Sequence, residues 1–389
     1  MLSFRNIAQL VLIILLSILG ARAFAQEIPD AVKSADFYFL IDADSKEVLL
    51  SKNADLRAPP SSMTKMMTAY VVFKQIKKGR ITINNQCLIG RDAWRKSGSS
   101  MFLNYGDIVT IDDLLKGLLA VSGNDAAIAL AQASAGGYQN FIQLMNNEAN
   151  EIGLKNSYFK NPHGLNEAGH YMSLRDLATL TMRIYQEFPQ YAHYFSITEF
   201  TYGKVTQPNR HPLIRTHYDG AVGGKTGHTN EGGYGVVAIV KRDHRRLIAV
   251  VNKAKTPVAR MKTVTALLDY GFKNYKKLVL FSANQELAKL PVWLGLKENI
   301  GAAPNQQIAL NVAANVSTED VVVKIKFLNP VKAPIYKGGK VADLIIEVKG
   351  YRDFQYPLFA TENIGMVGVL EKISRTSKYK FDNFINKYF

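Results

Sequence analysis

Cysteine is almost absent from this sequence, since Cys87 is the single thiol in 389 residues. One cysteine cannot pair within the chain, which excludes the small disulfide-rich secreted proteins. Hydrophobic residues make up 47% of the chain, enough for packed cores, and the length leaves room for two domains. The stability of this globular protein must therefore come from its cores.

Recurrent metal and nucleotide motifs are also missing. The seven histidines form no H-E-x-x-H and no other zinc spacing, which argues against a metallopeptidase. No G-x-S-x-G surrounds Ser62, as an α/β-hydrolase would require. Gly224-Lys225-Thr226 ends like a P-loop, but Asp219 stands where the first glycine of that motif belongs. We therefore expect neither a metal nor a cofactor.

No hydrophobic run is long enough to make a convincing membrane span. Residues 7–20 are uncharged, follow Arg5 and precede Ala23-Phe24-Ala25, a small-x-small cleavage site. A retained membrane helix needs about 20 apolar residues. Residues 1–25 are therefore predicted to be a secretory signal peptide, and the mature chain to begin near Gln26.

Acidic residues are scarce relative to basic ones, 32 against 48, which gives a formal net charge of +16. Such a balance suits an anionic partner. An exported chain rarely meets nucleic acid, and no aromatic-studded basic motif of the RNA-binding kind is present. We expect a membrane surface or an acidic wall polymer, and no nucleic acid, as the partner.

Residues 26–280 combine the patterns of strands and helices. Hairpins are predicted at 37–52 and 234–254, and helices at 62–78, 110–120, 124–135, 138–153, 173–188 and 258–276. Strands at both ends with helices between them indicate an α+β domain in which helices flank an antiparallel sheet. Residues 281–372 contain short β-rich runs separated by Pro, Gly and Asn, which predict a small all-β sandwich domain.

The tail, residues 373–389, is predicted to be an amphipathic helix. Its apolar face holds Phe381, Phe384, Ile385, Tyr388 and Phe389, and its cations lie largely elsewhere. Cations meet anionic headgroups while an aromatic face enters the acyl boundary. The tail is therefore predicted to be a peripheral membrane anchor; packing against the β domain is the alternative.

Ser62 and Lys65 form the first candidate catalytic pair. Other S-x-x-K strings occur in the chain, but Ser62 follows Pro59-Pro60 and begins a helical pattern. Residues three apart share a helix face, so the amine can reach the hydroxyl. A helix N-terminus disfavours the ammonium form of Lys65 and favours negative charge on the Ser62 oxygen.

Two further short motifs are weak evidence for a catalytic site when each is taken alone. Ser122-Gly123-Asn124 lies between two predicted helices. It could simply form the C-cap of the first helix and the N-cap of the second, or it could supply a second catalytic hydroxyl and an amide that binds substrate. Lys225-Thr226-Gly227 is the only K-T-G and begins a hairpin. On a strand edge, Lys225 and Thr226 could bind a carboxylate while Gly227 lets a peptide backbone approach and pair.

S-x-x-K, S-x-N and K-T-G in this order are typical of the penicillin-binding protein and serine β-lactamase superfamily. The chain resembles its low-molecular-weight D-alanyl-D-alanine carboxypeptidases, serine peptidases that trim peptidoglycan, in PPSSMTKMMTAYVV, VSGNDAAIALA, NPHGLNEAGHYMSLRDLA and GGKTGHTNEGGYGVVA. NPVKAPIYKGGKVADLIIEV is similar to the family's second domain. The resemblance covers nearly the whole mature chain.

The resemblance implies a role for each motif residue. Ser62 would attack the carbonyl between the two terminal D-alanines of a pentapeptide stem, and Lys65 would take its proton. Ser122 would pass a proton to the leaving D-Ala, and Asn124 would orient the substrate amide. Lys225 would keep the pocket positive and help to relay protons. The same serine would bind β-lactam antibiotics covalently.

The resemblance also implies the binding groups. Thr226 would hold the terminal carboxylate, and the backbone N–H groups of Ser62 and His228 would form the oxyanion hole. Arg210 and Arg260 look like the family's additional arginines for the loop and the carboxylate, although a surface salt bridge would explain either one. The expected location is the extracytoplasmic, periplasmic face of the cytoplasmic membrane.

Three alternatives stay open. A serine β-lactamase is the nearest, but class A enzymes have S-D-N where this chain has Ser122-Gly123-Asn124, and no convincing equivalent of their deacylating glutamate is found. A peptidoglycan D,D-endopeptidase would use the same residues. An inactive wall-binding scaffold is the alternative from outside the enzymes.

Overall fold

The computed structural model describes residues 27–243 and 245–388, the last of them, 379–388, as backbone only. The predicted signal peptide lies outside these residues. The described chain forms two compact units, Glu27–Asn274 and a second that begins at Tyr275. The predicted boundary at 280/281 falls inside strand β10 (Tyr275–Phe281), which pairs with β13 (Ile308–Ala313) and so lies wholly in the second unit.

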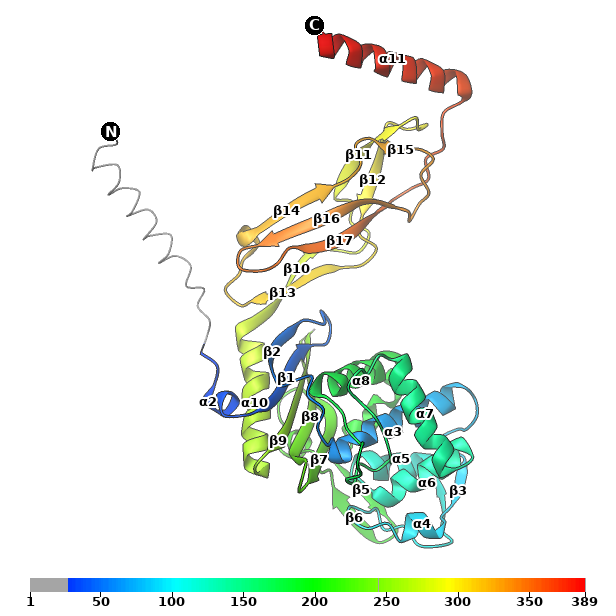
Figure 1. The fold of residues 1–389 in the computed structure, drawn as a ribbon, viewed down its shortest axis with the longest axis vertical. Helices are drawn as coiled ribbons and strands as arrows, with labels where there is room; N and C mark the ends of the chain where they lie inside the picture. The colour runs from blue at the N-terminus through cyan, green and yellow to red at the C-terminus, as the bar shows by residue number, and fades with distance from the viewer. Residues whose placement is uncertain (1–26, 244, 389) are drawn as a thin grey trace, which may run out of the picture. The chain divides into compact units, whose positions relative to one another are not determined.

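An antiparallel sheet forms the centre of the first unit (Figure 1). Its strands, in spatial order, are β2 (Val48–Lys52), β1 (Phe37–Asp42), β9 (Arg245–Ala254), β8 (Gly233–Arg242) and β7 (Ala221–Thr229). The two predicted hairpins, β1–β2 and β8–β9, are confirmed. Because β7 is an edge strand, one side of its backbone has no strand partner within this sheet.

Helices cover both faces of this sheet (Figure 1). One face is covered by α10 (Pro257–Asn274), which approaches so closely that a Cβ on Gly271 would lie 2.9 Å from Leu40. The helical layer on the other face consists of α3 (Lys65–Lys77), α5 (Ile111–Leu119), α6 (Asn124–Ala135), α7 (Tyr138–Glu151) and α8 (Leu174–Glu187). This arrangement confirms the predicted α+β class.

Local sequence signals set the ends of these helices. The Thr110 side chain caps α5 by accepting from the backbone N–H of Asp113, as the capping-box pattern predicts. Gly136 ends α6 in the left-handed conformation. The helix predicted at 62–78 begins with a tight turn, η1 (Ser61–Thr64), before α3 starts at Lys65.

Short elements connect these layers. They are α2 (Asp30–Lys33), β3 (Gln86–Leu88), α4 (Arg91–Trp94), β4 (Ile108–Thr110), η2 (Pro189–Phe195), β5 (Glu199–Tyr202), β6 (Val205–Pro208) and α9 (Pro212–Arg215). The two-stranded β3–β4 sheet and the β5–β6 hairpin lie beside the helical layer (Figure 1).

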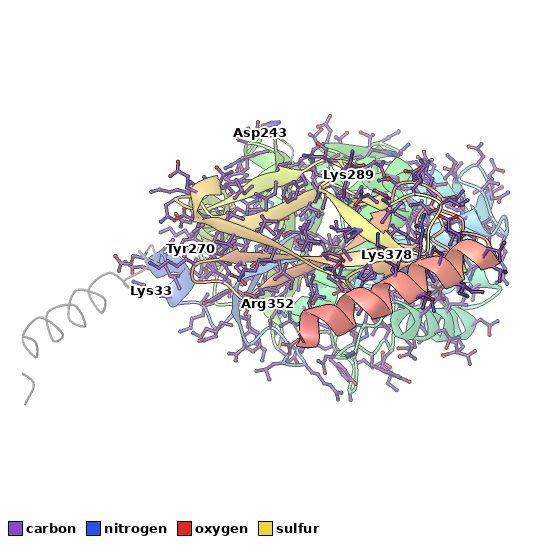
Figure 2. All side chains as sticks on the ribbon, turned by 90° about the horizontal axis from the view of Figure 1, so that it is seen from above. Lys33, Asp243, Tyr270, Lys289, Arg352 and Lys378 are labelled. Carbon is purple, nitrogen blue, oxygen red and sulfur yellow. The ribbon has the colours of Figure 1, made fainter. Side chains whose placement is uncertain are left out.

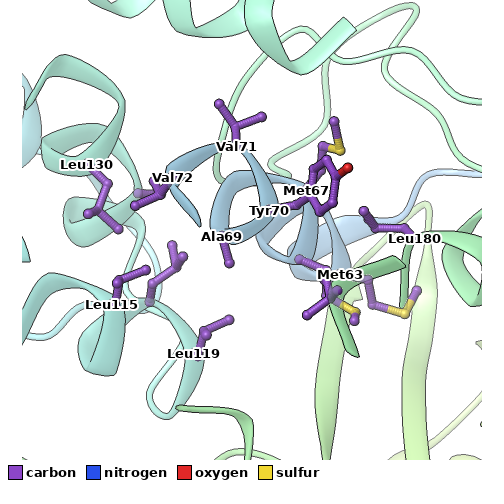
Figure 3. Close-up of a cluster of buried hydrophobic side chains, with 14 of the residues drawn as sticks. Met63, Met67, Ala69, Tyr70, Val71, Val72, Leu115, Leu119, Leu130 and Leu180 are labelled. Carbon is purple, nitrogen blue, oxygen red and sulfur yellow. The ribbon is translucent and has the colours of Figure 1, made fainter. Parts of the chain in front are cut away.

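Helix α3 runs through the core of the first unit. Its residues from Lys65 to Phe73 are all buried, so the helix is apolar around most of its circumference. Figure 3 shows Met63 and Met67 near Leu180 on one side of the helix, and Val72 near Leu130 on the other. The core therefore fixes the start of α3, where Ser62 and Lys65 lie.

The second unit is all-β apart from a 3-10 turn, η3 (Thr318–Asp320), and its final helix. One sheet pairs β10 with β13. The other contains, in spatial order, β14 (Val321–Lys326), β16 (Lys340–Val348), β17 (Phe354–Ala360), β12 (Asn299–Ala303), β11 (Ala288–Trp293) and β15 (Val331–Lys332). Buried Ile300, Leu310, Leu344 and Leu358 belong to its core. The prediction of a small all-β domain is confirmed.

The chain ends in helix α11 (Val369–Tyr388), which begins before the predicted start at residue 373. Arg375 pairs with Glu371 and also donates to the carbonyl of Gly295, while Lys378 is exposed. Figure 2 shows Lys289, Arg352 and Lys378 as side chains of the second unit. No helix in the described part of the chain has the length and hydropathy needed to cross a bilayer.

Candidate active site

The Lys65 amine lies at the centre of the candidate site. Its Nζ is 3.1 Å from Oγ of Ser62, 2.7 Å from Oδ1 of Asn124 and 2.7 Å from the carbonyl oxygen of His163. The spacing of Ser62 and Lys65 therefore brings hydroxyl and amine into contact, as predicted. Lys65 is fully buried.

Burial controls the protonation of Lys65. Loss of hydration lowers its pKa well below the ordinary 10.5, and the positive charges of Lys225 and Lys96 act in the same direction. A neutral amine has two N–H donors and one lone pair. The oxygens of Asn124 and His163 can only accept, so the two N–H groups satisfy them and the lone pair is left for the Ser62 hydroxyl.

A second amine approaches from the sheet. Lys225 on β7 is buried and donates to Oγ of Ser122 at 2.9 Å and to the carbonyl of Thr226 at 3.1 Å. Burial, followed by the charges of Arg210 and Arg260, lowers its pKa from 10.5 to about 7. Ser122 itself has a left-handed backbone, with φ of 67°, a conformation that is costly for a residue other than glycine.

Edge strand β7 packs directly against the turn that carries Ser62. Oγ of Ser61 lies 3.0 Å from Oγ1 of Thr229. A Cβ on Gly227 would lie 2.8 Å from the carbonyl oxygen of Pro60, so only glycine allows this approach. The structure thus brings the S-x-x-K, S-x-N and K-T-G segments together.

The remaining predicted residues border this centre. Thr226 is largely buried on β7. His228 is exposed and stacks on Tyr234, with ring centroids 3.9 Å apart. The guanidinium carbon of Arg260 also lies over the Tyr234 ring, 5.9 Å from its centroid. The Arg260 side chain donates to the carbonyl of Gly235. Within the residues that the structure describes, the partly buried Arg260 forms no salt bridge.

Arg210 is the second arginine whose charge lowers the pKa of Lys225. Its side chain donates to Oε1 of Gln207, and its backbone N–H donates to the carbonyl of Ala120 at the end of α5. Its guanidinium is exposed, unlike that of Arg260, and no salt bridge is formed by it within the described chain. Both arginines act on the pKa of Lys225.

Asp125 is a site residue that the sequence analysis missed. Its buried carboxylate accepts from the backbone N–H groups of Met101 and Leu103 and from the Ser100 hydroxyl. It thereby fixes the loop that holds Asn124. Its position directly after S-x-N was the available signal, but the partner loop is distant in sequence and carries no motif.

Residues 161–178 resemble the family, but no role was predicted for them. This segment supplies the His163 carbonyl that accepts from Lys65, and His170 links it to η1 through Oγ1 of Thr64 at 2.8 Å. Both imidazoles are held neutral, because burial lowers the pKa of His163 to about 3 and that of His170 to about 4. A backbone carbonyl leaves no identifiable sequence signal.

Comparison with known proteins agrees with this geometry. Residues 23–256 match the family described as D-alanyl-D-alanine carboxypeptidase, and residues 275–365 match the C-terminal domain of penicillin-binding protein 5. The chain is 33% identical to the Bacillus subtilis D-alanyl-D-alanine carboxypeptidase DacF, over 96% of this chain and 97% of that one.

The chain belongs to the D-alanyl-D-alanine carboxypeptidase family. The Escherichia coli carboxypeptidase DacA is 32% identical over 90% of this chain and 88% of its own. Among solved structures, penicillin-binding protein 5 from Haemophilus influenzae superposes with a TM-score of 0.80 at 32% identity, covering 85% of this chain and 98% of its own. The predicted family and fold are confirmed.

Within the described residues, no group of three or more His, Cys, Asp or Glu side chains is arranged to hold a metal ion. The two lysines, two serines and one asparagine supply donors, acceptors and a base for proton transfer.

Proposed function

We propose that this protein is a serine D-Ala-D-Ala carboxypeptidase that removes the terminal D-alanine from peptidoglycan pentapeptide stems through an acyl-enzyme on Ser62. The observation that carries the proposal is the Lys65 amine, which is buried, satisfied by two acceptors and aimed at the Ser62 hydroxyl. Such a pair gives a nucleophile without a histidine.

Acylation follows from this arrangement. Oγ of Ser62 attacks the carbonyl carbon of the penultimate D-alanine while its proton passes to Nζ of Lys65. When the C–N bond breaks, the proton held by Lys65 is relayed through the Ser122 hydroxyl, which Lys225 holds at 2.9 Å, to the leaving D-Ala amine. Lys65 is then neutral again and takes a proton from the water that attacks the ester. Return of this proton to Oγ of Ser62 releases the tetrapeptide.

The oxyanion and the carboxylate need separate donors. We assign the oxyanion to the backbone N–H groups of Ser62 and His228; removal of one such donor typically costs about 3 kcal/mol of barrier. The terminal carboxylate is assigned to Thr226 with Arg260 and Arg210, whose charges already act on nearby Lys225. The substrate backbone would pair with the open edge of β7.

The same serine would react with β-lactams, whose strained amide stands in for the scissile bond. Release of D-alanine from a soluble acyl-D-Ala-D-Ala peptide, compared with turnover of a penicillin, tests the proposal. We expect D-alanine release and a long-lived penicillin adduct, both lost in Ser62→Ala. Fast penicillin turnover would indicate a β-lactamase, cleavage of cross-linked stems an endopeptidase, and no reaction a scaffold.

We further propose that the protein is exported and held on the outer face of the cytoplasmic membrane by its terminal helix. The residues predicted to form the aromatic face lie in 381–389, whose side chains are outside the described part of the chain. The support is the sequence pattern, the helical backbone of α11 and the exposed cation Lys378.

Deletion of residues 373–389 tests the anchor. The truncated protein should retain D-alanine release from soluble peptides and no longer sediment with vesicles that contain anionic lipid. If the truncated protein still sediments with these vesicles, the helix is not the anchor.

A further inference from the structure

Exposed aromatic and cationic side chains alternate on helix α4 and the loop that follows it. The guanidinium carbon of Arg91 lies 5.4 Å from the ring centroid of Tyr105, and that of Arg95 lies 5.7 Å from Trp94. The two rings are 6.3 Å apart. We call these four residues, Arg91, Tyr105, Trp94 and Arg95, the arginine–aromatic ladder.

The ladder faces solvent because of the local helical geometry. Arg91, Trp94 and Arg95 share one face of α4, since residues three and four apart are neighbours on a helix, whereas Ala93 is fully buried. The exposed fraction is 46% for Trp94 and 57% for Tyr105. Within the described chain, neither arginine forms a salt bridge, so both guanidinium groups can pair with an outside anion.

Further exposed apolar side chains belong to the same stretch of chain. They are Phe102, Leu88 and Ile108, and Leu88 and Ile108 lie opposite each other where β3 pairs with β4. Contiguous exposed apolar groups beside cations mark interaction surfaces. Aromatic residues and arginine are the side chains that most often dominate binding energy.

The ladder is continuous with the active site. The next residues along the chain supply the carbonyls of Ser97 and Ser99, which accept from the side chain and backbone of Asn124. Between them, Lys96 lies close enough to Lys65 to lower its pKa. Trp94 is three residues from Ser97, a separation of at most roughly 11 Å for an extended chain.

These dimensions match a polymeric substrate. An extended peptide of five residues is about 17 Å long. A stem whose terminal D-alanine lies at Ser62 therefore has its upstream residues and its sugar within reach of the ladder. Stem peptides carry free carboxylates, which complement Arg91 and Arg95, and the apolar faces of sugar rings fit flat against Trp94 and Tyr105.

We propose that the arginine–aromatic ladder is an exosite for the wall polymer, binding the carboxylates and sugar rings upstream of the scissile bond. This inference rests on the proposed function and deepens it: the preferred substrate is a stem attached to a glycan strand. An exosite raises kcat/KM for the polymer and adds nothing for a peptide too short to reach it.

Kinetics on two substrates test the exosite. The substrates are soluble glycan strands that carry pentapeptides and a short acyl-D-Ala-D-Ala tripeptide. In the Trp94→Ala/Arg95→Ala double variant, we expect the ratio of kcat/KM on strands to kcat/KM on tripeptide to fall about tenfold. Tyr336→Ala, at a more exposed aromatic in the second unit, should leave the ratio at its wild-type value.

Two results would overturn the exosite: an unchanged ratio in the double variant, or equal losses on both substrates, which would indicate damage to the site as a whole. The rate of labelling by fluorescent penicillin checks the fold of each variant. Arg95→Lys should recover part of the lost ratio, because it keeps the charge.

A binding assay separates failure of the exosite from failure of the proposed function. In a Ser62→Ala background, cosedimentation with insoluble peptidoglycan needs no catalysis, so it tests the ladder even if the wild-type protein releases no D-alanine. The double variant should bind the polymer about tenfold more weakly. If its polymer binding is unchanged and only binding to anionic lipid vesicles falls, the ladder is a lipid site and the inference is wrong.

Discussion

Nζ of Lys65 lies 2.7 Å from Oδ1 of Asn124, so the asparagine amide accepts one N–H of the buried lysine. The amide oxygen accepts an N–H without adding charge. Its own Nδ2 donates to the carbonyl of Ser97 at 2.8 Å, so the amide cannot turn around without losing both contacts. The orientation of the Lys65 lone pair thus depends on this side chain together with the carbonyl of His163.

Asn124→Asp should therefore suppress acylation at neutral pH. A carboxylate this close raises the pKa of a lysine by about 1–3 units, so the neutral fraction of Lys65 falls, by at most about 1000-fold. The second-order rate of penicillin acylation should fall accordingly and recover as the pH rises. The matched change Asn140→Asp, at an exposed site on α7, should have no effect, and a wild-type pH profile in Asn124→Asp would contradict this assignment.

Arg260→Gln should raise the pKa of Lys225. The Arg260 charge is one of the causes that bring this pKa down to about 7, so its removal lets Lys225 stay protonated to higher pH. Titration of the lysine Cε resonance by NMR, assigned with a Lys225→Arg protein, measures the midpoint. Arg260→Lys keeps the charge, so its titration midpoint should stay near the wild-type value. If the midpoint of Arg260→Gln equals that of the wild-type protein, the arginine does not act on Lys225.

Asp125→Asn should destabilise the protein and reduce its activity together. The amide offers one acceptor where the carboxylate serves Met101, Leu103 and Ser100. Leaving buried donors unpaired costs about 1–3 kcal/mol each, which urea unfolding measures. The loop that supports Asn124 loosens, so acylation also slows. Asp243→Asn, the same change at an exposed position, should alter neither quantity; an Asp125→Asn protein of wild-type stability would refute this role.

His170 should make the free energy of unfolding depend on pH below neutrality. Its folded pKa is about 4 against an ordinary 6.5, so between these values the unfolded chain binds the extra proton. Stability then falls as the pH drops from 6.5 to 4, by on the order of 3 kcal/mol at 1.36 kcal/mol per unit. His170→Gln should flatten this part of the urea-unfolding profile, and exposed His217→Gln should not. A profile unchanged by His170→Gln would rule out this source.

The sequence predicted the parts of this protein that depend on short-range patterns. Helix and strand periodicity placed the main elements of the first unit close to their observed bounds. The three short motifs identified the residues that meet at the site, because S-x-x-K needs only one helix face. The order of the three motifs along the chain resembles that of a known family, and the comparisons confirm this family.

The supporting contacts could not be predicted because they join segments far apart in the chain through unremarkable groups. The His163 carbonyl is a backbone atom, and any residue at that position carries one. Asp125 acts on a loop more than 20 residues away. The ladder combines α4 with Tyr105, which follows an irregular loop. The alternation of arginine and aromatic side chains therefore arises only in the folded chain and is not visible in the sequence.

The central claim is that a neutral Lys65 takes the proton of Ser62, and the acylation rate of Lys65→Arg tests it most directly. Arginine keeps the length and polarity of the side chain but does not deprotonate in proteins. The account predicts that the second-order rate of penicillin acylation falls by roughly 1000-fold or more, the size of effect that loss of a general base produces. The rate is measured by intact mass at neutral pH on folded protein. A Lys65→Arg protein that acylates Ser62 at close to the wild-type rate would contradict it.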